Sequence, residues 1–202
     1  MIEVAGLCKS YPKKGSRKKT DRIKAIHNVS FTAGDGKITG LLGSNGAGKS
    51  TTLRILSTLI SAEAGTAKVD GFDVAESPID VRQRIGFLPH NAGIYPRLSA
   101  IENVRYYAEV SGMKGPTLTK RLDELVDMLD MAEFAHRRTE GFSQGQKTKV
   151  GLARALVHKP KNLILDEPTN GLDVMATRGL RKLIKVLKDE GHCILFSSHI
   201  MQ

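Results

Sequence analysis

The sequence predicts an α/β fold, and two patterns together with the chain length support that prediction. Short apolar runs typical of buried strands alternate with stretches whose apolar residues recur at helical spacing. The chain has 202 residues, of which 40% are hydrophobic and 26% are charged. This length suits one ordinary domain, and this composition disfavours disordered, collagen-like and coiled-coil proteins. Residues 1–202 are therefore expected to form one domain with a substantial core.

Strands are predicted in two parts of the chain. The first forty residues are expected to form short antiparallel strands. Further along, four short aliphatic runs end at glycine or polar residues, as the buried strands of a parallel sheet do. These four predicted strands are Ile38–Leu42, Ile85–Leu88, 163–165 and 194–196.

Helices are predicted where apolar residues repeat every three or four positions. Gly191 follows the last of these stripes, in the position where a left-handed residue commonly ends a helix. No internal repeat or linker divides the chain, so any subdomain is expected to be an insertion. The three stripes are Leu53, Ile55, Leu56 and Leu59; Leu118, Leu122, Leu125, Val126 and Leu129; and Leu180, Leu183, Ile184 and Leu187.

The net charge of +10 is concentrated near the N-terminus. Seven of the twelve residues at positions 13–24 are lysine or arginine, and only Asp21 among them is acidic. Such a run can contact nucleic acid or anionic lipid headgroups. A solvated turn between two strands is the favoured interpretation, because no aromatic residues that could stack on bases are interleaved. We therefore expect no nucleic-acid partner, and contact with anionic lipid headgroups stays open.

The sequence also indicates a cellular compartment. The longest apolar runs, such as residues 38–43 and 193–196, are far shorter than the roughly 18 residues that span a bilayer. The first ten residues lack the basic-then-apolar arrangement of a secretory signal. Cys8 and Cys193 do not have the spacing of a disulfide framework. The expectation is a cytoplasmic protein with two free thiols.

A phosphate loop is predicted between the strand Ile38–Leu42 and the first helical stripe. The segment GSNGAGKST at 43–51 matches the pattern GxxxxGK[ST]. Its glycines permit a tight loop whose backbone NH groups turn inward, and the following helix offers a positive N-terminus to phosphate. A glycine-rich turn that merely connects two elements is disfavoured by this context. The predicted nucleotide-binding residues here are Gly43, Ser44, Asn45, Gly46, Ala47, Gly48, Lys49, Ser50 and Thr51.

Two carboxylates follow a later strand. The chain reads NLILDEPTNGLD from residue 162, so that Asp166 and Glu167 lie at the carboxyl edge of the sheet, where ligands of open α/β sheets bind. Lys49 would meet the β and γ phosphates, while Ser50 and Asp166 would hold Mg²⁺. Glu167 would polarise the water that attacks the γ-phosphate. The alternative, a solvated acidic loop, is disfavoured by the phosphate loop upstream.

Five motifs resemble those of ABC-type ATPases, in the family's order. They are the phosphate loop, FSQGQ at 142–146, LILDEP at 163–168, NGLD at 170–173 and SSH at 197–199. The resemblance covers essentially the whole chain. The segment IYPRLSAIENV at 94–104 is similar to the branch that includes bacterial sodium-efflux and drug-resistance exporter ATPases.

The resemblance implies a particular version of the α/β fold. A phosphate-loop NTPase (RecA-like) core would carry an N-terminal antiparallel β subdomain, with a helical subdomain inserted at about residues 91–150. Domains of this family usually continue with a further strand and helix after the SSH segment. The end at Gln202 therefore suggests a truncated chain or a gene fragment.

The resemblance also implies a head-to-tail homodimer that shares ATP. The phosphate loop of one chain would bind the nucleotide, and Ser143, Gly145 and Gln146 of the other would cover it. A helix predicted from Ser143 to Val157 would then point its N-terminus at the γ-phosphate. Considered alone, Ser143 is an ordinary N-cap residue.

Three more residues receive roles from the same resemblance. Tyr11 would stack on adenine, although an exposed strand tyrosine is an equal alternative. His199 would hydrogen-bond the γ-phosphate or the attacking water. Asp173 would contribute to the nucleotide site, and an N-cap role is compatible with it.

Two residues depart from the family pattern. His90 occupies a position where the family usually has glutamine, and imidazole is a poor ligand for a hard ion such as Mg²⁺. We hypothesise that His90 acts through water or as a lever that leaves the metal when its loop moves. Gln144 replaces a usual glycine in the signature segment, where its side chain can crowd the phosphate or add a donor.

The favoured function is the Mg²⁺-dependent ATPase subunit of an ABC exporter of sodium ions or drugs, peripheral on the inner face of the cell membrane. It would require an integral membrane permease. Residues 87–107 contain Phe87, Tyr95, Tyr106 and Tyr107, a composition that suits either a docking groove for a partner helix or core packing. A soluble ABC ATPase of translation, repair or cofactor assembly is the alternative. Glu167 argues against a third class, a nucleotide sensor without hydrolysis.

Overall fold

The protein contains two four-stranded sheets, as seen in a computed structural model that describes residues 1–13, 15 and 21–199. Sheet A is antiparallel, with strand order β2-β1-β4-β5, and sheet B is parallel, with strand order β3-β8-β7-β6. Sheet A consists of β1 (Ile2–Pro12), β2 (Arg22–Ala33), β4 (Ala64–Val69) and β5 (Phe72–Asp73). Sheet B consists of β3 (Ile38–Leu42), β6 (Ile85–Leu88), β7 (Asn162–Asp166) and β8 (Cys193–Ser198).

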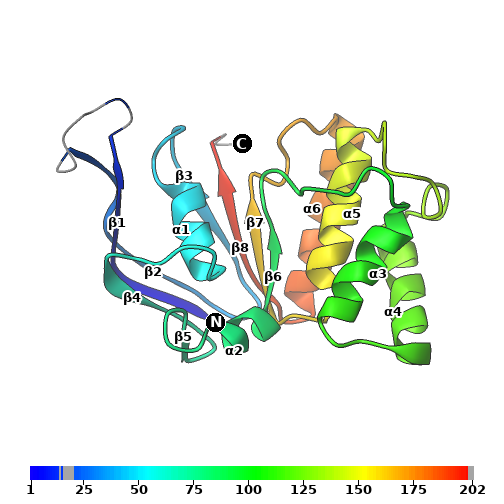
Figure 1. The fold of residues 1–202 in the computed structure, drawn as a ribbon, viewed down its shortest axis with the longest axis horizontal. Coiled ribbons are helices and arrows are strands. Elements are labelled where there is room, and N and C mark those ends of the chain that lie inside the picture. Colours follow the sequence, from blue (N-terminus) through cyan, green and yellow to red (C-terminus); the bar gives the residue numbers. More distant parts are fainter. Residues whose placement is uncertain (14, 16–20, 200–202) are drawn as a thin grey trace.

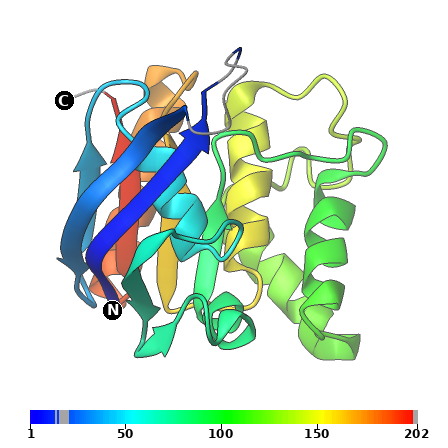
Figure 2. The ribbon, with the colours of Figure 1, turned by 60° about the vertical axis from the view of Figure 1, so that its left-hand side comes forward.

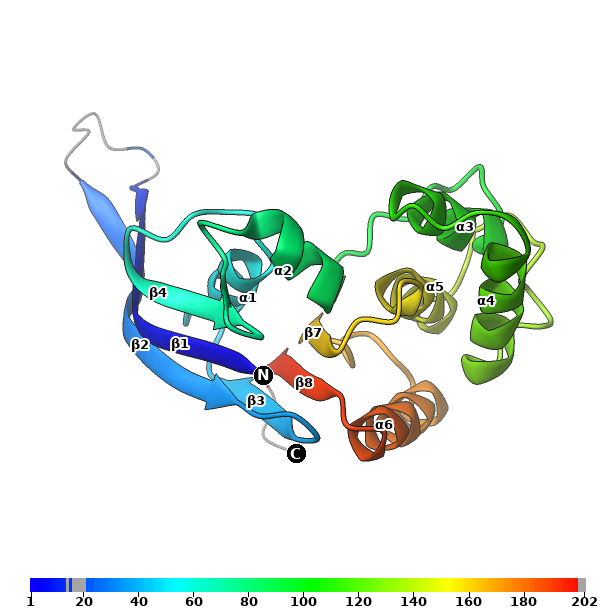
Figure 3. The same ribbon diagram turned by 90° about the horizontal axis from the view of Figure 1, so that it is seen from below.

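The helices occupy three places around sheet B. The first, α1 (Lys49–Leu56), lies between the two sheets, and α6 (Val174–Asp189) covers the other face of sheet B (Figures 1 and 3). A helical group of α3 (Ala100–Val110), α4 (Gly115–Met128) and α5 (Gln144–Leu156) stands beside β6 (Figure 2). The short α2 (Pro78–Arg84) leads into β6. The fold is thus the predicted α/β phosphate-loop NTPase fold, with an antiparallel sheet at the N-terminal side.

The central strands separate two hydrophobic clusters. Leu163 and Leu165 of β7 face a cluster formed with α3, α4, α5 and α6. Ile164, which lies between them in the chain, faces a second cluster formed with α1, α2 and sheet A. Because successive side chains of a strand point to opposite faces, an uninterrupted apolar run is needed here. This two-sided burial fixes the carboxyl end of β7, where the acidic residues follow.

The predicted helices and their ends are largely confirmed. The stripe that includes Leu118, Leu122 and Leu125 is buried on α4, and Leu180 and Leu187 are buried on α6. Gly191 has φ +93° directly after α6, as expected for a left-handed cap. The first stripe differs at its end, because α1 stops at Leu56 and the side chain of Leu59 is 59% exposed.

The predicted strand Ile38–Leu42 has the predicted bounds but not the predicted burial. It is the end strand of sheet B, and the side chains of Ile38 and Leu42 are exposed. An edge strand and a central strand can have the same aliphatic composition, so the run alone did not reveal its place in the sheet. The strands predicted at the N-terminus are also longer than expected, since β1 and β2 have 11 and 12 residues.

The basic run lies where β1 is connected to β2. Lys14, Arg17, Lys18 and Lys19 are outside the described residues. The described part shows that Pro12 pairs with Arg22, so the run joins two antiparallel strands, and that Arg22 forms an ion pair with Glu63. Cys8 and Cys193 are free cysteines, as predicted. Within the described ranges, no helix has the length and apolar character needed to cross a bilayer.

Candidate nucleotide-binding site

The phosphate loop, residues 43–51, joins the carboxyl end of β3 to the start of α1. Gly46 and Gly48 have φ values of +83° and +85°, in the left-handed region that favours glycine. A Cβ on Gly48 would lie 2.2 Å from the carbonyl oxygen of Ala25 in β2. Only glycine therefore fits at this position. Gly48 is also the N-cap of α1 and provides no side-chain hydrogen bond to the helix.

Lys49 is held inside the loop. Its ammonium donates to the carbonyl oxygens of Gly43 at 2.7 Å and Ser44 at 3.1 Å. The residue is only 8% exposed, although lysine is rarely buried without a partner. Its Nζ also lies 3.5 Å from Oε1 of Glu167. The lysine and the acidic end of β7 thus meet in one place.

Asp166 connects three elements of the site. Its Oδ1 accepts hydrogen bonds from the hydroxyls of Ser50 at 2.9 Å and Ser197 at 2.7 Å. The Ser197 hydroxyl in turn accepts from the backbone NH of Glu167 at 2.9 Å. Asp166 is 2% exposed. These bonds fix α1, β7 and β8 relative to one another.

Glu167 lies directly after β7 with φ +52°. Its Oε2 is 2.6 Å from Nδ1 of His199. Burial opposes ionisation of Glu167, but the hydrogen bond and charge of His199 and the charge of Lys49 outweigh it, so the pKa lies below its usual value. Glu167 is therefore a carboxylate at neutral pH and can accept a proton.

An open pocket of about 640 Å³ lies over Lys49, Glu167 and His199, whereas Asp166 lines the smaller pocket described next. Its lining includes four residues from distant parts of the chain: Tyr11, His90, Asn170 and His199. From the phosphate loop, the lining includes all of residues 45–51. The size suits a small-molecule ligand, and the loop supplies anion-binding backbone groups. Tyr11 itself is 37% exposed.

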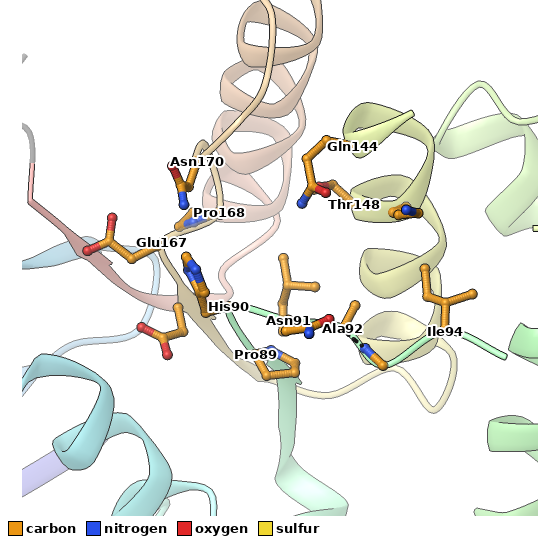
Figure 4. A pocket seen from close by; sticks show the side chains of 14 residues that line it. Pro89, His90, Asn91, Ala92, Ile94, Gln144, Thr148, Glu167, Pro168 and Asn170 are labelled. Atoms are coloured by element: carbon orange, nitrogen blue, oxygen red, sulfur yellow. Dashed lines mark hydrogen bonds between the residues drawn. The ribbon is translucent and has the colours of Figure 1, made fainter. Parts of the chain in front are cut away.

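His90 also lines a second, smaller pocket of about 200 Å³. In Figure 4 its side chain lies on the Glu167 side, while Gln144 and Thr148 of α5 lie across the pocket. The loop of residues 89–94, called the His90 loop below, lines this pocket together with the acidic end of β7 and the start of α5. Gln144, the departure in the signature segment, faces this second pocket rather than the phosphate loop.

The signature residues lie at the N-terminus of α5, outside the larger pocket. The Ser143 hydroxyl accepts from the Gln146 backbone NH at 3.2 Å, and the Gln146 side chain accepts from the Ser143 NH at 3.1 Å. This capping box confirms Ser143 as an N-cap. Gly145 lies near α6, because a Cβ added to Gly145 would be 3.4 Å from the Cβ of Ala176. Asp173 is the N-cap of α6 and accepts from the Ala176 NH at 2.8 Å.

Three residues of the site were not singled out from the sequence. Ser197 bridges Asp166 and Glu167, and Asn170 lines both pockets. Both lie inside motifs that were recognised, SSH and NGLD, so the signal was present. Ala25, which restricts Gly48, is marked by no feature of the sequence.

The oxygen donors near the phosphate loop fit Mg²⁺. Among the described residues, no group of three or more His, Cys, Asp and Glu side chains could hold a metal ion alone. Mg²⁺ is commonly bound through one or two protein oxygens together with substrate phosphates and water. The Ser50 hydroxyl and the Asp166 carboxylate are such donors. The site therefore suits a metal that binds together with a nucleotide.

Comparison with known proteins agrees with this geometry. The chain matches the ABC transporter family over residues 26–170. It is 42% identical over 181 residues to the ABC transporter ATP-binding protein NatA of Bacillus subtilis (strain 168), covering 89% of this chain and 74% of NatA. It is 32% identical over 202 residues to the linearmycin resistance ATP-binding protein LnrL of the same strain, covering 100% of this chain but 62% of LnrL.

A solved structure is similar throughout. The ATP-binding cassette MJ0796, in a dimeric post-hydrolysis state bound to ADP and Pi, superposes with a TM-score of 0.88. The two sequences are 26% identical, and the match covers 100% of this chain and 89% of that one. The chain is therefore an ATPase cassette and belongs to the ABC transporter family.

Proposed function

We propose that this chain hydrolyses ATP at the pocket over the phosphate loop and drives an ABC exporter through a membrane-embedded permease. The observation that carries the proposal is the meeting of Lys49, Asp166, Glu167 and His199 at the carboxyl ends of β7 and β8. Binding alone would require the lysine and the loop. A carboxylate kept ionised beside them supplies a base for water attack.

The chemistry is divided among these residues. Inward-facing backbone NH groups of the phosphate loop and the Lys49 ammonium would bind the β and γ phosphates. Ser50 and Asp166 would hold Mg²⁺, which when bound neutralises charge on the phosphate oxygens. Glu167 would accept a proton from the attacking water, and the hydrogen bond to His199 orients its carboxylate. Tyr11 would pack against the adenine at the rim of the pocket.

A second copy of the chain would complete the site. Ser143 is exposed, and neither it nor Gly145 and Gln146 lines the pocket over the phosphate loop. The N-terminus of α5 is therefore accessible to phosphate that is bound by another protomer. The dimeric state of the similar cassette MJ0796 supports this arrangement. Asp173, which caps the adjacent helix α6, would lie at the same interface.

The permease would bind beside the helical group. Tyr95 and Tyr106 are 44% and 48% exposed, and their rings are in edge-to-face contact at 5.7 Å. A groove of about 150 Å³ lies next to them, with Phe87 and Tyr107 among its lining residues. Exposed aromatic side chains beside a groove are typical of an interface core. We place the chain beside that partner on the inner face of the membrane, where Lys13 would contact anionic headgroups.

The names of relatives support export as the process. NatA is named as an ABC transporter ATP-binding protein and LnrL as a linearmycin resistance ATP-binding protein. A drug is therefore proposed as cargo, and sodium ions are the other cargo that the resemblance of residues 94–104 to the sodium-efflux branch implies. The chain spans 62% of LnrL, so this proposal concerns the cassette as part of a larger assembly. Recovery of the protein from membranes together with a multispanning protein is expected, and recovery without one would contradict the permease partner.

The catalytic assignment is tested with Glu167→Gln. We expect turnover to fall by about 100-fold or more, because a general base contributes on the order of 10²–10⁴ to the rate. ATP affinity should be retained, and ATP should hold the variant as a dimer in light scattering. Glu124→Gln is the matched control, because Glu124 is paired with Arg121 in the helical group, away from the pocket. Normal hydrolysis by Glu167→Gln would contradict the proposed role.

A further inference from the structure

The His90 loop is held by a side chain of α5. Arg154 donates from Nη1 to the carbonyl oxygens of Ala92 at 2.8 Å and Gly93 at 3.2 Å. Hydrogen bonds from a charged donor are stronger than those between neutral groups. The two carbonyls lie two and three residues after His90 in the chain. The guanidinium therefore restrains the backbone immediately after the histidine.

Arg154 is itself fixed in place. Its guanidinium carbon lies 3.7 Å from the centroid of the Tyr107 ring on α3, a stacking contact that suits arginine. Burial lowers the pKa of the guanidinium, yet within the described part of the chain no carboxylate forms an ion pair with it. A half-buried cation without a carboxylate depends on its other contacts to offset desolvation. Those contacts are the two loop carbonyls and the ring.

Glycines let the loop and β6 pack closely on the same helix. A Cβ on Gly151, one turn before Arg154, would lie 2.6 Å from Cδ1 of Leu88 and 3.1 Å from Cβ of Ala92. On the strand side of this contact, a Cβ on Gly86 of β6 would lie 2.2 Å from the carbonyl oxygen of Ala155 in α5. The segment from Gly86 to Gly93 is thus joined to α5 at three successive places.

We propose that Arg154 is a positioning residue that makes the His90 loop move together with α5. The inference rests on the proposed function, because it concerns how His90 is presented to Glu167 and how Ser143 is presented to a second protomer. Ser143 begins the same helix that carries Arg154. Any shift of α5 that brings Ser143 to phosphate would then carry His90 with it. Arg154 lines neither of the two pockets that His90 lines. It lines the separate groove of about 150 Å³ that also contains Phe87 and Tyr107, and it therefore acts on the nucleotide site only through the loop.

The mobility of the loop tests this directly. Hydrogen exchange of the peptide that covers residues 89–95 should become about tenfold faster or more in Arg154→Ala, because two charged hydrogen bonds are lost. Lys149→Ala is the matched control. Lys149 is also a cation of α5, but it binds Asp130 instead of the His90 loop. Exchange of the loop in Lys149→Ala should stay at the wild-type rate.

The steady-state kinetics separate positioning from general damage. Arg154→Ala should lower kcat by about tenfold to 100-fold, as misplacement of site groups does, while KM for ATP changes little because the phosphate loop is intact. Arg154→Lys should restore part of kcat, since it keeps one donor near the carbonyls. Gly151→Ala leaves Arg154 in place but pushes against Ala92, so it should also speed loop exchange and lower kcat.

Two results would overturn the inference. One is loop exchange at the wild-type rate in Arg154→Ala. The other is faster exchange in Arg154→Ala or Gly151→Ala with unchanged kcat. If Arg154→Ala does not fold, Arg154→Lys and Gly151→Ala are judged by the same two measurements. Hydrogen exchange does not depend on hydrolysis, so a failure of the proposed catalytic role, seen in Glu167→Gln, is distinguishable from a failure of this inference.

Discussion

Two helix N-termini in this molecule are built in opposite ways. The start of α1 has Gly48 as its N-cap and no side-chain hydrogen bond, so its NH groups stay available to a ligand. The start of α5 is closed by the capping box of Ser143 and Gln146. The N-terminus of α1 lies in a pocket whose charged residues, Lys49 and Glu167, both come from the same chain. The N-terminus of α5 is exposed, and side chains of its own chain already satisfy its capping hydrogen bonds.

The difference indicates where the ligand is bound first. An uncapped N-terminus is stabilised by an anion, and Lys49 already lies beside it. A capped N-terminus is stable without a ligand, so it can remain folded until a second protomer brings its bound nucleotide. We therefore expect nucleotide affinity to depend on the phosphate loop and turnover to depend on both ends. Three variants or conditions test that division, beginning with the largest expected effect.

Lys49→Ala should remove nucleotide binding at the first end. The loss of a charged contact to phosphate is expected to weaken ATP affinity by about 100-fold or more, with turnover falling in parallel. Isothermal titration calorimetry on the purified chain measures the affinity. Lys37→Ala, on the loop before β3, is the control and should bind ATP normally. Unchanged ATP affinity in Lys49→Ala would contradict the conclusion that nucleotide affinity depends on the phosphate loop at the start of α1.

Ser143→Ala should affect turnover while leaving affinity of the single chain intact. Loss of the cap is expected to cost about 1 kcal/mol in the free energy of unfolding. Turnover should fall further, by up to about 100-fold, because one charge-stabilising donor is lost. Ser99→Ala is closely matched, since Ser99 forms the same kind of capping box with Glu102 on α3. Equal turnover in the two variants would show that Ser143 is only a cap.

The smallest effect concerns Glu167 and pH. Its folded-state pKa lies below the ordinary value of 4.5, so the carboxylate contributes stability that is fully present above that pH. The contribution is lost as pH falls through the folded-state pKa. Wild type should therefore lose more unfolding free energy between pH 6 and pH 3 than Glu167→Gln does, as measured by urea denaturation. An equal or larger loss in the variant would contradict the stabilisation of the Glu167 carboxylate by His199 and Lys49.

The local chemistry of the site could be predicted from sequence because it lies in continuous segments. The phosphate loop, Asp166 with Glu167, and the helix start at Ser143 are each set by neighbouring residues. Capping boxes are equally local, and SAIE at residues 99–102 marks the start of α3, which the prediction of a helical subdomain at about residues 91–150 does not specify. The weakly apolar strand AGTAKV of β4 gave no comparable signal.

Contacts between distant segments were the part that could not be predicted. Ser197 reaches Asp166 because β8 pairs with β7 in a register that places these two residues opposite each other. Ala25 restricts Gly48 because sheet A folds over the phosphate loop. Arg154 reaches the His90 loop across more than sixty residues of sequence. Each of these contacts depends on strand order or helix packing, which the spacing of residues along one chain does not contain.

The open side of β3 matters for anyone who handles this protein in solution. Within the described residues β3 pairs only with β8, and Ile38 and Leu42 are 41% and 54% exposed along it. Such an exposed edge strand can pair with a strand of another molecule as the protein concentration rises. Association of that origin would occur without ATP and would strengthen with protein concentration alone. Sizing runs with and without nucleotide, over a dilution series, are therefore needed before any oligomer is attributed to shared ATP.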